Sequence, residues 1–241
     1  MARQVLITLV LTVAAAGCEQ SYDQLEGMAT YALTDESGDV TTVGVQITTA
    51  SLDALQEHAM AVAAFPEDAV TQTYVNHAQV MFEPHGHDPT GVGEVPHIDV
   101  HYHGISIEER EAIDCSEEPV PDEESLPYGY VVEGSGQTPW FGTCVPGMGV
   151  HAANKDAPGQ NPDNKHQLTA VLEYGYHDGE LSFIMPMLHH AVIKEREAVE
   201  LEVTRPDVLG RVTRWPTRFF ATHDEEVGVI RFELTDFSPI Q

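Results

Sequence analysis

The stretch Val199-Glu200-Leu201-Glu202-Val203-Thr204 decides the fold class, together with Ile230-Arg231-Phe232-Glu233-Leu234-Thr235. In both stretches apolar and polar side chains alternate with a period of two, which is typical of a β-strand with one buried face. Weaker alternation predicts further strands over residues 30–34, 40–48, 79–82, 97–103, 167–174 and 180–184. The Asp178-Gly179 pair predicts a hairpin between the last two ranges, because it supplies the positive φ of a tight turn.

Helical signals are few and short. Ser51 is a candidate cap for a helix over residues 52–58, and Ser106 with Glu109 forms a capping box for a helix that ends near Ile113. The sequence therefore predicts a mainly β chain, namely a single antiparallel β-barrel or sandwich domain with a few short helices, following an N-terminal signal peptide.

The N-terminus has the composition of an export signal. Arg3 precedes a largely apolar run of twelve residues, 5–16, and Gly17 leads to Cys18. Twelve residues fall short of the roughly 20 that a spanning helix needs, so we expect a cleaved signal peptide over 1–17. We expect lipid on Cys18, a tether over 18–28, a β-rich domain over 29–241 and an extracytoplasmic location on the outer face of a membrane. Ala15 stands where Leu is commonest, so plain secretion remains the alternative.

Charge is the unusual feature of the composition. After loss of Arg3 with the signal, 10 Lys and Arg face 39 Asp and Glu, a formal charge of −29. Nucleic acid and anionic lipid surfaces would be repelled by such a chain. The acids are dispersed and Lys is scarce, a pattern that favours a halophilic protein over an ordinary acidic secreted one, since strong salt screens the repulsion.

Cysteine usage agrees with export. With Cys18 lipidated, Cys115 and Cys144 remain as one pair, for which an oxidising compartment favours a disulfide over two buried thiols.

The candidate site is rich in histidine. In an extended strand over 97–103, His97, Asp99, His101 and His103 share one face, while Ile98, Val100 and Tyr102 take the other. Further imidazoles come from His85 and His87 in the preceding loop and from His151 after a compact Gly-Met-Gly turn. We expect His97, Asp99, His101 and His151 to converge in one pocket, with His85 or His87 nearby.

This ligand set favours a divalent transition metal. Neutral imidazole with carboxylate suits Zn, Fe, Mn or Cu. The same four residues on a strand are also typical of a solvated sheet face or of a buried hydrogen-bonded network.

At these residues the chain resembles the TTHB-like domain family of exported, functionally uncharacterised proteins. The matching blocks are 84–89, 95–102, 146–151, 174–179, 183–187 and 215–219. The resemblance implies a β-rich domain, an extracytoplasmic address and a homo-oligomer, but no reaction. Two positions depart from the family pattern: Met185 replaces a Glu, and His103 replaces a Tyr or Phe.

Two functions compete. The first is a non-catalytic exported lipoprotein whose His/Asp cluster binds a metal or a small ligand, or braces the fold. The second is a cupin-type metalloenzyme with His101, His103 and His151 as metal ligands. The helix expected after Ser106 carries Glu108 away from a cupin-like position, and the chain lacks the Gly-x-Ser-x-Gly of a serine hydrolase. We favour the first function, with no catalytic residue assigned.

Overall fold

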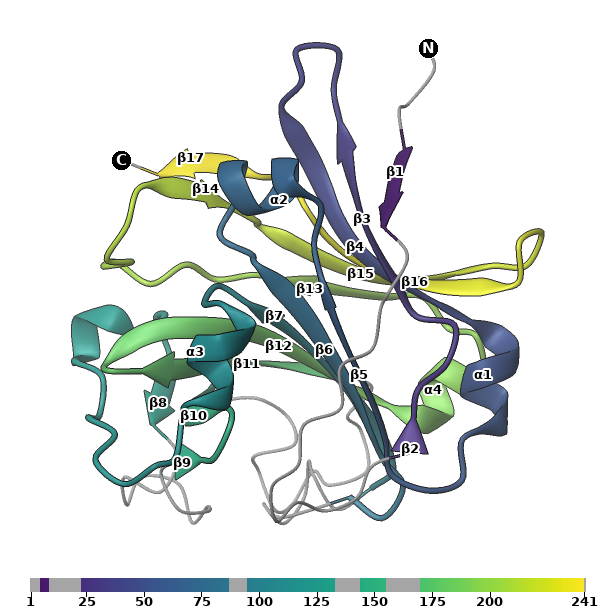
Figure 1. Cartoon of the computed structure of the whole chain (residues 1–241), viewed down its shortest axis with the longest axis horizontal. Coiled ribbons are helices and arrows are strands. Elements are labelled where there is room, and N and C mark those ends of the chain that lie inside the picture. Colours follow the sequence, from purple (N-terminus) through teal and green to yellow (C-terminus); the bar gives the residue numbers. More distant parts are fainter. Residues whose placement is uncertain (1–4, 9–22, 87–94, 133–143, 155–169, 241) are drawn as a thin grey trace.

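Two β-sheets form the body of the protein and share one hydrophobic core (Figure 1). The computed structural model describes residues 5–8, 23–86, 95–132, 144–154 and 170–240. The chain is mainly β, as predicted, with four short α-helices and one 3-10 turn in the described residues.

The first sheet has six antiparallel strands. Their order across the sheet is β1 (Val5–Thr8), β3 (Ala29–Thr34), β4 (Val40–Thr48), β16 (Val229–Thr235), β15 (Arg218–Asp224) and β13 (Val199–Glu202). The two stretches with the clearest alternation, β13 and β16, lie here, and both neighbour β15.

The second sheet has nine strands and carries the candidate site. Its order is β2 (Asp23–Gln24), β5 (Ala59–Ala64), β6 (His77–Glu83), β7 (His97–His103), β12 (Glu180–His189), β11 (Ala170–His177), β10 (Gly149–Asn154) and β8 (Tyr130–Val132), with β9 (Cys144–Val145) also pairing with β10. All its pairs are antiparallel except β2 with β5. A separate ribbon joins β14 (Thr213–Trp215) to β17 (Ser238–Ile240).

The sheets pack as a sandwich and do not close into a barrel. In each sheet, the two strands at the ends of the order have a single neighbour among the described strands. Val45 and Phe232 of the first sheet lie in the same buried cluster as Val100 and Tyr102 of the second. Of the two architectures that the sequence allows, the open sandwich is the one adopted.

The helices sit at strand ends. They are α1 (Thr49–Ala54), α2 (Glu67–Gln72), α3 (Ile107–Glu111), α4 (His190–Lys194) and the 3-10 turn η1 (Glu123–Ser125). The capping box of Ser106 and Glu109 is present at α3. The helix expected over 52–58 instead begins three residues earlier, because Thr48, at the end of β4, accepts the backbone N–H of Ser51 as the cap.

Hydrophobic alternation did not predict the strands, or parts of strands, that are buried on both faces. β10 is buried along most of its length, and β12 continues to His189, five residues beyond the predicted end. Without a solvated face, the polar residues that produce a period of two are missing. The turn between β11 and β12 is the predicted hairpin, with Asp178 and Gly179 at φ of 53° and 77°.

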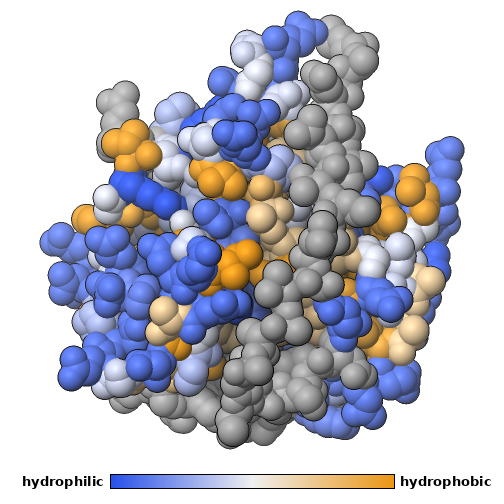
Figure 2. Space-filling model, viewed as in Figure 1, coloured by the Kyte–Doolittle hydropathy of each residue, from blue (hydrophilic) through white to orange (hydrophobic). Residues whose placement is uncertain are grey.

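The N-terminal segment makes few contacts with the sheets. β1 lies within the predicted signal peptide and pairs only with β3, at the edge of the first sheet. Cleavage after residue 17 would leave the other ladders of that sheet intact. Cys18 lies outside the described residues. Hydrophilic residues dominate the surface in Figure 2, in line with the acidic composition.

Candidate functional site

One face of the second sheet collects the histidines. Because side chains alternate along a strand, the residues that point away from the sandwich core fall into rows across β6, β7, β12, β11 and β10. One row holds His77, His103, Phe183, Gly175 and His151. We call this surface the histidine face and define it by His77, Gln79, His97, Asp99, His101, His103 and His151.

The histidine face is buried, not solvated. His97 and His103 are 0% exposed, His101 is 1% exposed and Asp99 is 4% exposed. The predicted alternation is correct, since Ile98, Val100 and Tyr102 lie in the sandwich core. The alternative of a solvated sheet face is therefore wrong.

Helix α3 covers part of this face (Figure 1). Its buried residue Arg110 donates from Nη1 to Oε1 of Gln79 over 3.2 Å. A guanidinium only donates, so this contact fixes the orientation of the Gln79 amide. Nε2 of His103 lies 3.3 Å from the same Oε1 and must also donate. Nδ1 of His103 therefore keeps its lone pair, and it has no hydrogen-bond partner among the described residues.

The hydrogen bond of His77 fixes its lone-pair nitrogen in the same way, although the sequence alone assigned this residue no role. Its Nδ1 lies 3.1 Å from the carbonyl oxygen of Ile105 and must donate to it. Nε2 is then the lone-pair nitrogen, again unpartnered in the described part of the chain. The ring stacks on that of His103, with centroids 4.4 Å apart. The weak sequence signal was the alternation of polar His77, Gln79 and Glu83 along one strand.

The ring of Phe183 lies among three imidazoles of the histidine face. Its ring centroid is 4.9 Å from that of His101, 5.3 Å from that of His103 and 5.2 Å from that of His151. Gly175 makes room for the ring, because a Cβ at this position would lie 1.8 Å from Cε1 of Phe183. The ring of Phe183 thus contacts all three imidazoles, and His151 lies on the same face as His101 and His103.

Burial keeps these imidazoles neutral. Desolvation lowers the pKa of His77 to about 3, helped by the nearby Arg110. Desolvation also lowers the pKa of His101 to about 4, although the Asp99 carboxylate opposes the shift. The pKa of His103 falls well below its ordinary value, through burial and then through His77. Neutral imidazole is the form that binds metal ions.

His97 and Asp99 form a second pair on the same strand. Nδ1 of His97 donates to the carbonyl oxygen of Val95 over 2.7 Å, which turns Nε2 toward Oδ2 of Asp99, 3.4 Å away. Two ligand atoms of a tetrahedral ion with bonds of 2.0–2.1 Å are separated by roughly 3.3 Å, so this pair has a spacing that a metal ion would accept.

Of the two loop histidines, the structure describes His85. His85 is exposed, and its ring lies 6.1 Å from that of His58, whose Nδ1 is 2.7 Å from Oε2 of Glu83. The structure therefore places His85 beside His58, whose partner Glu83 pairs across the strands with His97. His87 lies outside the described residues.

A different trio has ligand atoms close together. Those of Glu118, His177 and Asp178 all lie within 4.8 Å of one another, and no other trio of His, Cys, Asp or Glu does so in the described ranges. His177 donates from Nδ1 to Glu118 over 2.7 Å, and the backbone N–H of Asp178 donates to the second Glu118 oxygen over 3.1 Å. Sequence reasoning missed this group, because Glu118 comes from a distant loop.

The disulfide helps to explain how that loop is placed. Cys115 and Cys144 are bonded, with Cα atoms 5.7 Å apart, which is the pairing expected from the sequence. It ties the segment before Glu118 to β9 on the second sheet. The side chain of Asp178 is 82% exposed, so the trio is a surface group held by hydrogen bonds at a hairpin turn.

The histidine face can supply neutral imidazoles and one carboxylate, but its ligand atoms are spread along the sheet. Metal binding there requires side chains to turn toward a common ion. Family models, curated proteins and solved structures give no match to the chain, so the resemblance to the TTHB-like domain family stays a prediction. Among the described residues, no helix has the length and apolar character of a membrane span.

Proposed function

We propose that this chain is an exported protein, tethered to the outside of a membrane through lipid on Cys18, that binds a transition-metal ion on its histidine face. Metal binding is supported above all by the buried lone pairs of the imidazole rings. Nδ1 of His103 and Nε2 of His77 have no hydrogen-bond partner among the described residues. A buried polar group without a partner costs free energy, and a bound ion would offset that cost.

The contacts around these imidazoles support the same proposal. Arg110, Gln79 and the carbonyl oxygen of Ile105 fix which nitrogen of each ring keeps its lone pair. Outer hydrogen bonds of this kind orient the histidine ligands of metal sites. A hydrogen-bonded core network would instead use those lone pairs as acceptors, and the described residues offer them no donor.

The cupin-type alternative lacks this support. Cupins are barrels, whereas both sheets here are open. The rings of His101 and His103 lie parallel with centroids 5.5 Å apart, and the ring of Phe183 contacts both of them and His151. We therefore assign no reaction to the chain.

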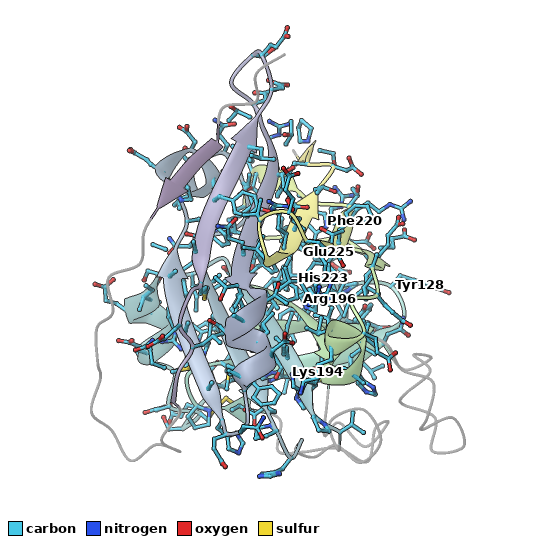
Figure 3. The ribbon with its side chains drawn as sticks, turned by 90° about the vertical axis from the view of Figure 1, so that its right-hand side faces the viewer. Tyr128, Lys194, Arg196, Phe220, His223 and Glu225 are labelled. Atoms are coloured by element: carbon cyan, nitrogen blue, oxygen red, sulfur yellow. A yellow bond between two sulfur atoms is a disulfide. The ribbon has the colours of Figure 1, made fainter. Side chains whose placement is uncertain are left out.

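Elemental analysis of the purified full chain tests the proposed metal binding. After exposure to Zn, Fe, Mn or Cu and dialysis at neutral pH, we expect one of these metals to be retained at close to one ion per chain. His101→Leu should abolish retention. The control is His223→Asn, because His223 lies on β15 of the other sheet (Figure 3). No retained metal, or equal retention by His101→Leu, would refute the metal site.

The lipid anchor is tested separately. Cys18→Ala removes the only thiol to which the predicted lipid can be attached, so labelled fatty acid should enter the wild-type chain alone. Acyl chains contribute about 0.8 kcal/mol per buried methylene, so only the wild type should partition with membranes. Equal labelling of the variant would exclude the anchor. The homo-oligomer implied by the family resemblance is tested by light scattering of the purified chain.

A further inference from the structure

The methionines gather on the histidine face. The chain has seven, and five of them contact this face or lie on it. Four are placed there by strand alternation and one packs onto it from the turn before β10: Met60, Met81, Met185, Met187 and Met148.

One row of the sheet brings three of these thioethers to a carboxylate. Met60 is the cross-strand partner of Met81, and Met81 and Met187 are the partners of Asp99 on its two sides. Met81, Met187 and Asp99 are 4%, 2% and 4% exposed. Directly opposed side chains have Cβ atoms about 5 Å apart, so the two thioethers flank Asp99 within the buried layer.

Polar contacts orient two of the sulfurs. Nε2 of Gln79 donates to Sδ of Met60 over 3.1 Å and to Sδ of Met81 over 3.4 Å. The other end of this amide is held by Arg110 and His103. Methionine often serves as a flexible filler of apolar cores. Here one amide side chain fixes thioethers and an imidazole together, an arrangement that apolar packing does not require.

His101 lies next to this row. It follows Asp99 by two residues on β7 and is opposite Gln79, so Met81 and Met187 are its diagonal neighbours, about 7 Å away and within reach of long side chains. Its side chain is 1% exposed, so the imidazole lies in the same buried layer as the thioethers.

Thioether sulfur is a soft donor. It selects Cu(I), whereas imidazole and carboxylate alone also suit Zn(II) and Mn(II). We propose that the histidine face is a copper site that prefers Cu(I) over Zn(II), with Met81, Met187 and His101 as ligands and Gln79 as a positioning residue. This inference rests on the proposed function that the face binds a transition metal.

Competition titrations of the full chain test the preference. Cu(I) is titrated without oxygen against bathocuproine disulfonate, and Zn(II) against a chromophoric chelator. The double variant Met81→Leu/Met187→Leu keeps the volume of both side chains. It should weaken Cu(I) binding at least about tenfold and leave Zn(II) binding unchanged. Met28→Leu is the matched control, since Met28 is buried in the sandwich core, and it should change neither.

X-ray absorption at the copper edge gives a second readout. Sulfur scattering should be present in the wild type and lost in the double variant, whose thermal midpoint verifies that it remains folded. Unchanged Cu(I) affinity and sulfur scattering in a folded double variant would overturn the thioether ligands. Wild-type binding of Zn(II) without Cu(I) would overturn the copper preference while the metal-binding function stands. Binding of neither ion would remove the proposed function itself.

Discussion

Acidification should destabilise the fold through the buried histidines. His77, His101 and His103 have folded-state pKa values lowered to about 3, to about 4 and well below the ordinary value, respectively. In the unfolded chain each titrates near 6.5. The unfolded state therefore binds more protons below pH 6.5, so this stability is fully present above that pH and is lost as the pH falls toward the folded values.

The magnitude follows from the unfolded state. Between pH 7.5 and pH 5.5 an unfolded histidine gains close to one proton, while the three buried rings stay neutral. Each therefore removes about 1.4 kcal/mol from the free energy of unfolding over this interval, and the three together remove about 4 kcal/mol. Histidine ligands with an ordinary pKa would lose their metal below about pH 6. The lowered pKa values of His77 and His101 move this proton competition to more acidic solution.

Urea unfolding at pH 7.5, 6.5 and 5.5 measures the effect. A chelator and constant molar salt keep bound metal and ionic screening out of the comparison. His77→Asn retains a donor for the carbonyl oxygen of Ile105 but cannot be protonated. The pH-dependent loss should be about 1.4 kcal/mol smaller in this variant. A free energy of unfolding that is flat from pH 7.5 to pH 5.5, or an equal loss in both proteins, would refute the reasoning.

Three further predictions concern stability. Because screening relieves repulsion among the acids of a chain with charge −28, the thermal midpoint should rise from low to molar potassium chloride, and a flat or falling curve would contradict the halophilic interpretation. Cys115→Ser/Cys144→Ser should lower the free energy of unfolding by about 3 kcal/mol in a denaturant titration, since the crosslink spans 29 residues; a loss below about 1 kcal/mol would show that it contributes little. Gly175→Ala should lower the free energy of unfolding by about 2 kcal/mol, because the added Cβ displaces the ring of Phe183, and a second change, Phe183→Leu, should recover part of that loss. A calorimetric midpoint equal to that of the wild type would show that the ring can move without cost.

Local sequence patterns determined the parts of the fold that depend on neighbours along the chain. The alternation in β13, β16 and β7, the Asp178-Gly179 turn and the capping box of α3 were all predictable, because each follows from backbone geometry within a few residues. The sharing of one strand face by His97, Asp99, His101 and His103 was predictable for the same reason.

Only the tertiary structure decided what that face meets. Strand order sets His77 and Gln79 of β6 on one side of β7 and Phe183 of β12 on the other, and no local pattern encodes which strands become neighbours. Burial of this face, to which α3 contributes, then sets the charge of the imidazoles. Removal from water lowers the pKa of His101 and keeps its ring neutral. Glu118 reaches His177 over 59 residues by the same kind of long-range packing. Alternation thus assigned each side chain to a face, whereas strand pairing and burial fixed its partners and its charge.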